Sequence, residues 1–267
     1  MSPKVSVVMS VYNNGRYLAE AVDSVLSQSF DDFEFIIIDD CSTDGASETL
    51  EKYASQDSRI VLVKNETNIG LTKSLNKTLK IAKGEYIARM DGDDICLPDR
   101  FKKQVEYLDR NPDIALVFAD IFLIDKNSKD ICMRYRPKSI KKMLLNLEIC
   151  NYFPHPAVML RGTAISALGG YNESCRTGQD QNLWIRMRDA GYLFGYVNEI
   201  LLKYRVNPDS VRGEERYNYW FKVAIYCIWN NSRCANFRYW KNLTLLQMVE
   251  MFIRALMPFS FYLRRLK

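Results

Sequence analysis

Apolar residues in the first 120 positions form short continuous runs that alternate with segments in which they recur every three or four positions. The runs predict buried strands and the periodic segments predict helices. The predicted strands are Val5–Val11, Phe33–Ile38, Arg59–Val63, Glu85–Met90 and Ala115–Ala119. The predicted helices are about Tyr17–Leu26, Ser47–Ala54, Leu71–Ala82 and Asp99–Asp109. This alternation favours an α/β fold with a Rossmann-like, mostly parallel central sheet and flanking helices.

After residue 120 the regular alternation ends. The pattern predicts a hairpin over Phe122–Arg134, a helix near Ile140–Leu147, a strand over Ala157–Leu160 and a helix over Asn182–Ala190. Pro154-His155-Pro156 marks a constrained loop before the last of these strands. We interpret residues 1–213 as one domain, with a nucleotide-binding half at 1–120 and an acceptor-facing half at 121–213.

Residues 214–267 differ from the rest of the chain in composition and predict a C-terminal helical extension. The net charge is +5 overall, and residues 216–267 alone hold nine Lys or Arg against one acidic residue, Glu250. This segment also contains 13 of the 33 aromatic residues. Basic side chains interleaved with aromatic rings on an apolar helix are typical of an anionic membrane surface, and they fit lipid better than nucleic acid. We therefore expect membrane-surface contact through residues 214–267 and no nucleic-acid partner.

The remaining composition is that of an ordinary globular protein, with 48% hydrophobic and 26% charged residues. Seven cysteines without a close-paired Cys-x-x-Cys spacing favour reduced thiols over disulfides or a zinc site. Met1–Lys4 leads directly into a predicted strand without a signal-peptide pattern, and no run of about 18 apolar residues predicts a transmembrane span. The expected location is cytoplasmic, peripheral at the inner face of the cytoplasmic membrane.

Acidic residues follow the fourth predicted strand in Met90-Asp91-Gly92-Asp93-Asp94. Ligands of α/β sheets bind beyond the carboxyl ends of the strands. Asp91 and Asp93 are two positions apart, so an extended chain would direct both carboxylates to one side. A divalent cation would relieve their mutual repulsion. The alternative is a solvated turn with helix-capping aspartates.

A second acidic pair, Asp39-Asp40, follows the apolar run Phe35–Ile38. Carboxylates there can accept hydrogen bonds from ribose hydroxyls or a base N–H. The adjoining Ser42-Thr43-Asp44 could instead cap the next helix, and both roles can coexist. Two acidic strand ends on one predicted sheet edge favour a nucleotide site.

The ordered motifs resemble those of family 2 glycosyltransferases with the GT-A fold. The resemblance rests on the segments Val5–Asn14, Ile36–Asp44, Asn68–Gly70 and Met90–Asp94, in this order and strand context, and covers about residues 3–210. It implies a metal-dependent, inverting enzyme that takes a sugar from a nucleotide-sugar donor.

The resemblance also implies roles for single residues on the donor side. The nucleoside would be contacted by Ser10, Tyr12 and Asp40, with the ring of Tyr12 beside the base and Asp39 supporting the pocket. Asp91 would approach the ribose, and Asp93 would ligate Mn²⁺ or Mg²⁺ bridging the donor diphosphate. Tyr12 could alternatively be a simple rim aromatic.

On the acceptor side, Thr177-Gly178-Gln179-Asp180 aligns with the family's Glu-Asp motif, with Gln179 in the place of the Glu. The resemblance makes Asp180 the base that deprotonates the acceptor hydroxyl, and the alternative is an N-cap of the following helix. His155 would shape the acceptor loop. Arg205 lies in a segment similar to the family's closing motif and could contact phosphate, whereas Asn207 replaces a common His and weakens any further metal ligand there.

The expected function is transfer of a sugar, from a UDP-sugar as the expected donor, to a hydroxyl of a glycan or lipid-linked acceptor in surface polysaccharide biosynthesis of the O-antigen or capsule type. A sugar nucleotidyltransferase is one alternative, although Val11–Arg16 is a poor triphosphate-binding loop. A non-catalytic sugar-nucleotide-binding membrane scaffold is another. Dinucleotide and P-loop enzymes are disfavoured because neither of their glycine motifs occurs.

Overall fold

The computed structural model describes residues 2–206 except 135, 137 and 149–150. Its first part alternates strands and helices along the chain, as the apolar pattern predicts. The strands are β1 (Val5–Val11), β2 (Phe33–Asp39), β3 (Ile60–Lys64) and β4 (Tyr86–Arg89). The helices between them are α1 (Gly15–Leu26), α2 (Ala46–Gln56) and α3 (Leu71–Ile81). Every residue of β1 is buried, which explains its unbroken apolar character.

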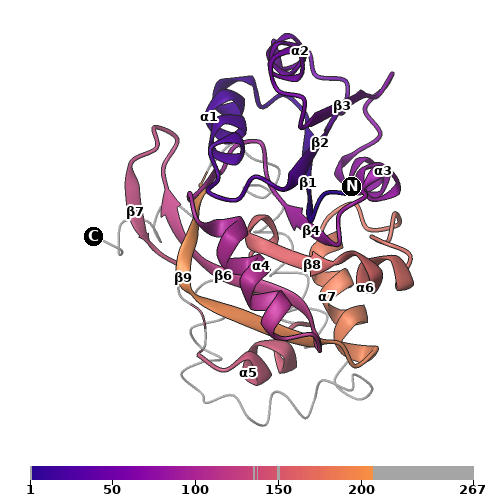
Figure 1. Ribbon diagram of the computed structural model, residues 1–267, viewed down its shortest axis with the longest axis vertical. Coiled ribbons are helices and arrows are strands. Elements are labelled where there is room, and N and C mark those ends of the chain that lie inside the picture. The colour runs from indigo at the N-terminus through magenta and orange to yellow at the C-terminus, as the bar shows by residue number, and fades with distance from the viewer. Residues whose placement is uncertain (1, 135, 137, 149–150, 207–267) are drawn as a thin grey trace, which may run out of the picture. The chain divides into compact units, whose positions relative to one another are not determined.

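Within the described part, all nine strands belong to one sheet (Figure 1). The remaining strands are β5 (Ile95–Cys96), β6 (Ile114–Ile124), β7 (Asp130–Met133), β8 (Val158–Arg161) and β9 (Leu193–Arg205). The strand order is β3-β2-β1-β4-β8-β6-β9-β5, with β7 paired to β6. β8 is antiparallel to both β4 and β6, so β6 and β9 run in the same direction as β1 to β4. The prediction of a mostly parallel α/β sheet is confirmed.

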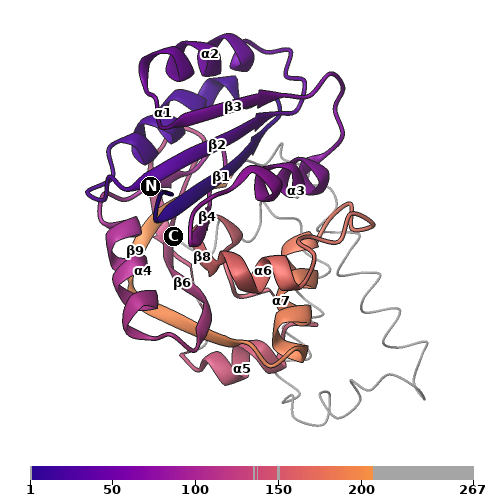
Figure 2. The same ribbon diagram turned by 45° about the vertical axis from the view of Figure 1, so that its right-hand side comes forward.

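Helices cover both faces of the sheet, as Figure 2 shows. One core cluster joins α1, α2 and α4 (Arg100–Arg110) to one face. The other joins α3 to α5 (Ile140–Leu145), α6 (Gly162–Ala167) and α7 (Gln179–Asp189). Alternate residues of β1 serve the two clusters, because Val7 and Met9 pack into the first and Val8 into the second. The central strands β1 and β4 are therefore buried on both sides.

The second half differs from the predicted elements at strands β6 and β9. The strand expected at Ala115–Ala119 continues to Ile124 as β6 and forms the predicted hairpin with β7, around a turn in which Asp125 donates its N–H to the carbonyl of Lys129. β9 is an additional long strand. The apolar pattern does not predict it, because its apolar residues are interrupted by Gly195, Asn198 and Glu199. Register shifts between β6 and β9 accommodate this irregular strand.

The described elements end with β9 at Arg205. The predicted domain boundary at 213, Asn207 and the predicted helical tail over residues 214–267 lie outside the described residues. In the portion that is described, no helix combines the length and apolar character needed to cross a bilayer.

Candidate active site

The carboxyl ends of three neighbouring parallel strands bring the predicted donor-side residues to one edge of the sheet. β1 lies between β2 and β4, with Val11 opposite Asp39 and Val8 opposite Arg89. Ser10 and Tyr12 therefore lie beside the acidic pair that ends β2. Asp91 and Asp93 follow β4 at the same edge. The topology thus assembles the residues that sequence motifs scatter over more than 80 positions.

The two acids at the end of β2 are both buried but make different contacts. Asp39 accepts the N–H of Ser42 at 3.0 Å through Oδ1. Asp40 accepts the side-chain N–H of Asn65 at 2.7 Å and the backbone N–H groups of Ile69 and Gly70 at 2.9 and 2.8 Å. Asp40 therefore fixes the 65–70 loop, which contains the predicted Asn68–Gly70 motif.

Hydrogen bonds join the loop after β1 to the loop after β2. Asn13 donates its N–H to Ser42 at 3.1 Å and accepts the N–H of Thr43 at 2.8 Å. Asp44 accepts the N–H of Gly15 at 2.7 Å and that of Ala46 at 3.2 Å, so it contacts the starts of both α1 and α2. Next to this junction Ser10 is buried, whereas Tyr12 is 49% exposed. An exposed ring beside two braced loops can stack on a planar group.

The acidic turn after β4 brings several charged side chains close together in a largely buried environment. Arg89 is fully buried and forms a close ion pair with Asp91. Burial, followed by the charge of Asp91, raises the pKa of Asp93 to about 6. Burial, followed by the charges of Asp93 and Asp91, raises the pKa of Asp94 well above its ordinary value. The Oδ2 atom of Asp94 has no hydrogen-bond partner. Added positive charge at this turn would relieve these costs.

Arg205 braces the acidic turn from the end of β9. Its backbone N–H donates to Asp94 Oδ1 at 2.8 Å, and its Nε donates to the carbonyl of Asp93 at 2.7 Å. The rest of the guanidinium donates to Glu20 on α1 and to the turn of the β6–β7 hairpin. A phosphate contact by Arg205 stays a prediction, and it would have to displace one of these bonds.

Asp180 lies in the first turn of α7 and is buried. The helix begins at Gln179, earlier than predicted, because Gly178 adopts a left-handed conformation with φ 70° that turns the chain into the helix. Gly178 occupies the N-cap position, so the alternative that Asp180 is the N-cap is wrong. Asp180 Oδ2 accepts the side-chain N–H of Asn151 at 2.7 Å.

Tyr171 is a buried tyrosine near several of these charged residues. Burial raises the pKa of its phenol, Arg89 lowers it, and Asp180 and Asp91 raise it further. Its hydroxyl lies 2.8 Å from His155 Nε2, and the His155 ring packs edge-on against Trp184. His155 is therefore held in the protein interior, where the predicted acceptor-side residue Gln179 is also buried.

Sequence reasoning missed Arg89, Asn151 and Tyr171 as members of this site. Arg89 carries a recognisable signal, since it is a charged residue in a predicted buried strand. Asn151 and Tyr171 carry none, because their contacts join distant segments.

The acidic turn fits a divalent cation that is shared with a diphosphate. Among the described residues, no group of three or more His, Cys, Asp or Glu side chains is gathered as in an all-protein metal site. Magnesium-type ions commonly take one or two carboxylates and complete their coordination with substrate phosphate and water. Asp93, with its raised pKa, and the unpartnered Oδ2 of Asp94 are oxygens whose environment favours such a charge.

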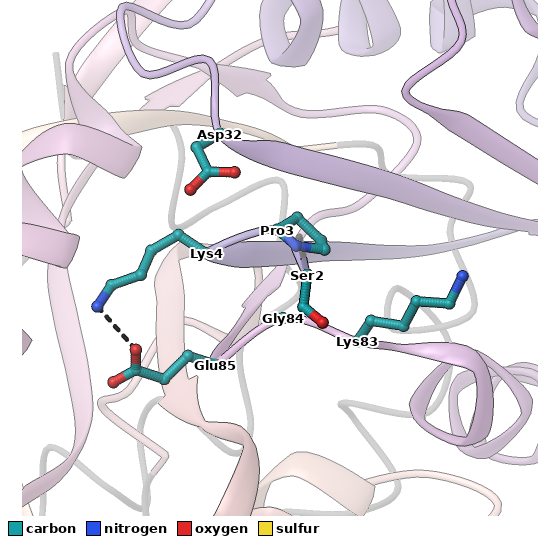
Figure 3. A pocket seen from close by; sticks show the side chains of 7 residues that line it. All are labelled: Ser2, Pro3, Lys4, Asp32, Lys83, Gly84 and Glu85. Carbon is teal, nitrogen blue, oxygen red and sulfur yellow. Dashed lines mark hydrogen bonds and ion pairs between the residues drawn. The ribbon is translucent and has the colours of Figure 1, made fainter.

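A separate hollow of about 340 Å³ lies at the opposite ends of the strands (Figure 3). Its lining residues include Lys4, Asp32 and Glu85, which directly precede β1, β2 and β4. Lys4 is already paired with Glu85 at 2.7 Å and with Asp109 at 2.9 Å. Because ligands of such sheets bind at the carboxyl ends, this hollow is not the candidate active site.

Comparisons with known proteins agree on one family. Residues 6–166 match the family described as Glycosyl transferase family 2. An uncharacterized glycosyltransferase, MJ1057 of Methanocaldococcus jannaschii, is 36% identical over 266 residues, covering 94% of this chain and 89% of that protein. The O-antigen biosynthesis glycosyltransferase WbnJ of Escherichia coli is 33% identical, with 78% and 82% covered.

Solved structures share the fold at lower identity. S. aureus TarS 1–349 in complex with UDP-GlcNAc has a TM-score of 0.63 at 22% identity, covering 83% of this chain and 66% of that one. The mannosyltransferase PcManGT of Pyrobaculum calidifontis, in complex with GDP-Man and Mn²⁺, has a TM-score of 0.65 at 19% identity, covering 82% and 61%. With its GT-A fold and its family match over residues 6–166, this chain belongs to the family 2 glycosyltransferases.

Proposed function

We propose that this glycosyltransferase moves a sugar from a nucleotide-sugar, with a UDP-sugar as the expected donor, to a hydroxyl of a glycan or lipid-linked acceptor, and that it inverts the anomeric carbon. The acceptor would be an intermediate of surface polysaccharide assembly of the O-antigen or capsule type.

One observation carries the proposal: the buried Tyr171 lies close enough to both Asp180 and Asp91 for each carboxylate to raise its pKa. The phenol of Tyr171 is sensitive to the charges of both Asp91 and Asp180, although these residues are 89 positions apart in sequence. A direct displacement needs this arrangement, with a base on the acceptor side and stabilisation of the leaving group on the donor side.

In the proposed step Asp180 accepts the proton of the acceptor hydroxyl while that oxygen bonds to the anomeric carbon of the donor sugar. The bond between this carbon and the diphosphate oxygen breaks, and its electron pair leaves with the nucleoside diphosphate. Attack from the face opposite the leaving group inverts the configuration. Because one carboxylate acts as base and none as nucleophile, no covalent sugar–enzyme intermediate is required.

The donor would lie at the ends of β1, β2 and β4. Tyr12 offers an exposed ring for the base, and Ser10 and the Asp39–Asp40 pair line the adjoining edge. Asp91 would approach the ribose, and Asp93 would hold the cation. A bound Mn²⁺ or Mg²⁺ would stabilise the charge that develops on the departing diphosphate.

Relatives support the donor and acceptor classes by their own descriptions. The TarS and PcManGT structures contain UDP-GlcNAc and GDP-Man respectively, and the second also contains Mn²⁺. WbnJ is described as an O-antigen enzyme and AmsE of Erwinia amylovora as an amylovoran biosynthesis enzyme, at 31% identity to this chain.

For the chain as a whole, we propose that residues 1–213 form the catalytic domain and that residues 214–267 contact the inner face of the cytoplasmic membrane. The support is compositional, since nine Lys or Arg and three Trp lie between residues 216 and 267. A membrane-bound position would bring the site to a lipid-linked acceptor.

The test is a panel of UDP-, GDP- and dTDP-sugars with Mn²⁺, using methyl glycosides and polyprenyl-diphosphate-linked sugars as acceptors, with nucleoside diphosphate release as the readout. Wild type is compared with Asp93→Asn, Asp180→Asn and the control Asp113→Asn, an exposed acid before β6. We expect metal-dependent release from one donor class, lost in the first two variants and retained in the control.

Other outcomes identify the competing functions. Release of pyrophosphate from a nucleoside triphosphate and a sugar phosphate would establish a nucleotidyltransferase. Saturable donor binding without turnover on any acceptor would favour a non-catalytic scaffold.

A further inference from the structure

We propose that Asn151 is a positioning residue that aims the carboxylate of Asp180 at the acceptor hydroxyl. This inference rests on the proposed function, because it assumes that Asp180 is the base. It adds a residue that no motif of the sequence indicates.

Asn151 has a separate partner for each polar atom of its side chain. Its Nδ2 donates to Asp180 Oδ2 at 2.7 Å. Its Oδ1 accepts the backbone N–H of Phe153 at 3.1 Å, which fixes the side chain against its own loop. The loop itself is held from the hairpin side, because the carbonyl of Asn151 accepts Arg134 Nη2 at 2.7 Å. The amide N–H is therefore presented to Asp180 in a fixed direction.

This direction matters because the rotation of the Asp180 side chain determines which carboxylate oxygen faces the substrate. The hydrogen bond from Asn151 to Oδ2 favours one rotation, in which Oδ2 faces Asn151 and Oδ1 is directed away from it. Proton transfer requires donor and acceptor within hydrogen-bond reach, so a misdirected carboxylate would slow the chemical step more than it would weaken donor binding.

The charged and titratable groups around this pair come from several elements. Arg134 holds the Asn151 loop, and Tyr171, paired with His155, senses the charge of Asp180. Arg89 and Asp91 act on the same tyrosine from the end of β4. On the far side of the loop, Glu148 is paired with Arg188 of α7 at 2.7 Å.

The sharpest test is Asn151→Asp, which preserves the shape of the side chain and the oxygen that accepts the Phe153 N–H. A protonated carboxyl at position 151 still donates a hydrogen bond to Asp180. Once ionised it cannot donate, and it repels the neighbouring carboxylate. The variant therefore retains the positioning contact at low pH and loses it as pH rises.

We expect kcat of Asn151→Asp relative to wild type to fall roughly 10- to 100-fold between pH 5 and pH 8, the range that corresponds to losing a hydrogen bond to a charged group. The donor KM and the thermal midpoint should stay near the wild-type values. Turnover is measured as nucleoside diphosphate release, with the donor and acceptor that the panel identifies.

Asn172→Asp is the matched control. Asn172 is exposed and accepts the N–H of Ser174 at 3.0 Å, so it has the same local turn bond as Asn151 without the contact to Asp180. Its activity ratio to wild type should be constant over the same pH range.

A pH-independent ratio for Asn151→Asp would overturn the inference, as would a loss of activity that arises from a higher donor KM and a lower thermal midpoint. The variant Asp180→Asn separates this failure from failure of the proposed function. If Asp180→Asn is inactive while Asn151→Asp has a flat profile, only the positioning role is wrong. If Asp180→Asn turns over at the wild-type rate, the proposed base is wrong and the inference falls with it.

Discussion

At the scale of single residues, the surroundings of Asp93 destabilise its ionised carboxylate, which is the form that would bind the cation in the proposed function. Burial and the neighbouring Asp91 raise the pKa of its carboxyl from 3.8 to about 6. The folded protein therefore binds this proton more tightly than the unfolded chain does. Protonation of Asp93 therefore favours the folded protein. This contribution to the free energy of unfolding is fully present below about pH 4 and is lost as pH rises through about 6.

We predict that Asp93→Asn raises the thermal midpoint at pH 7.5 in the absence of divalent ions, because the amide remains neutral. The gain should vanish near pH 4, where the wild-type carboxyl is also neutral. Mn²⁺ should stabilise the wild type and have little effect on the variant. Thermal unfolding at both pH values, with and without Mn²⁺, measures this. An equal Mn²⁺ effect on both proteins would contradict the assignment of the cation to Asp93.

Asp40 provides a second residue-scale prediction, since its carboxylate accepts three N–H groups from Asn65, Ile69 and Gly70. An amide at this position would direct N–H toward one of these donors. Asp40→Asn should lower the free energy of unfolding by about 1–3 kcal/mol and weaken UDP binding through the loosened 65–70 loop. Urea unfolding and UDP titration measure the two effects, with the exposed Asp32→Asn as control. Unchanged stability with lost binding would instead assign Asp40 to the nucleotide alone.

The residues that the sequence could identify are those whose position relative to a strand defines their role. Asp39, Asp40, Asp91 and Asp93 follow apolar runs, and the carboxyl ends of parallel strands meet. The partners of these residues could not be predicted in the same way. Asn151 contacts Asp180 across 29 positions and Arg205 contacts Asp93 across 112, and no local pattern records such contacts.

At the scale of elements, strand β9 links three other segments, because its last residue forms hydrogen bonds to each of them. Arg205 bonds to the acidic turn after β4, to Glu20 on α1 and to the turn between β6 and β7. Its guanidinium also packs over the ring of Tyr17 at 4.3 Å. The position of the acidic turn therefore depends on a strand far from it in sequence.

We predict that Arg205→Met lowers the free energy of unfolding by about 1–3 kcal/mol, because the carbonyls of Asp93 and Asp125 lose their hydrogen-bond donor, whereas the ion-pair partner Glu20 is half exposed and can be solvated. The variant should also bind Mn²⁺ more weakly, because the backbone of Asp93 loses its brace. Lys203→Met is the matched control on the same strand, since Lys203 forms an exposed ion pair with Asp130 at 2.9 Å. Lys203→Met should lower the free energy of unfolding by no more than about 1 kcal/mol. Urea unfolding that shows equal losses for both variants would refute the bracing role.

Element boundaries were predictable where the apolar pattern is uniform and less so where a turn sets them. β1 has the predicted bounds because all seven residues are apolar or buried. α7 starts at Gln179 because Gly178 adopts a positive φ, which a periodicity search cannot detect. β9 is only partly buried and is interrupted by polar residues, so its pairing with β6 determines its course.

At the scale of the whole molecule, alternation of strands and helices was sufficient to predict the α/β class and the mostly parallel sheet. The antiparallel insertion of β8 between β4 and β6 could not be deduced, because it depends on long-range pairing. That insertion joins the second half of the domain to strands β1 to β4, which carry the proposed donor residues.

The proposed membrane contact gives a prediction for the chain with residues 214–267 included. Replacing Arg264, Arg265 and Lys267 together by Gln should weaken binding to phosphatidylglycerol vesicles roughly 100-fold, at ~1 kcal/mol for each charge near the surface. Replacing the exposed Lys52, Lys126 and Lys129 removes the same charge and should have little effect. Vesicle co-sedimentation measures both, with phosphatidylcholine vesicles as the uncharged reference. Equal weakening by the two triple variants would mean that net charge, rather than the C-terminal segment, determines binding.

The central claim is direct displacement at the anomeric carbon with Asp180 as the base, and proton NMR of the first transferred product tests it most directly. The account predicts an anomeric configuration opposite to that of the donor, with no product from Asp180→Asn although this variant still binds the donor. Retention of the donor configuration, or product formation by Asp180→Asn at the wild-type rate, would contradict it.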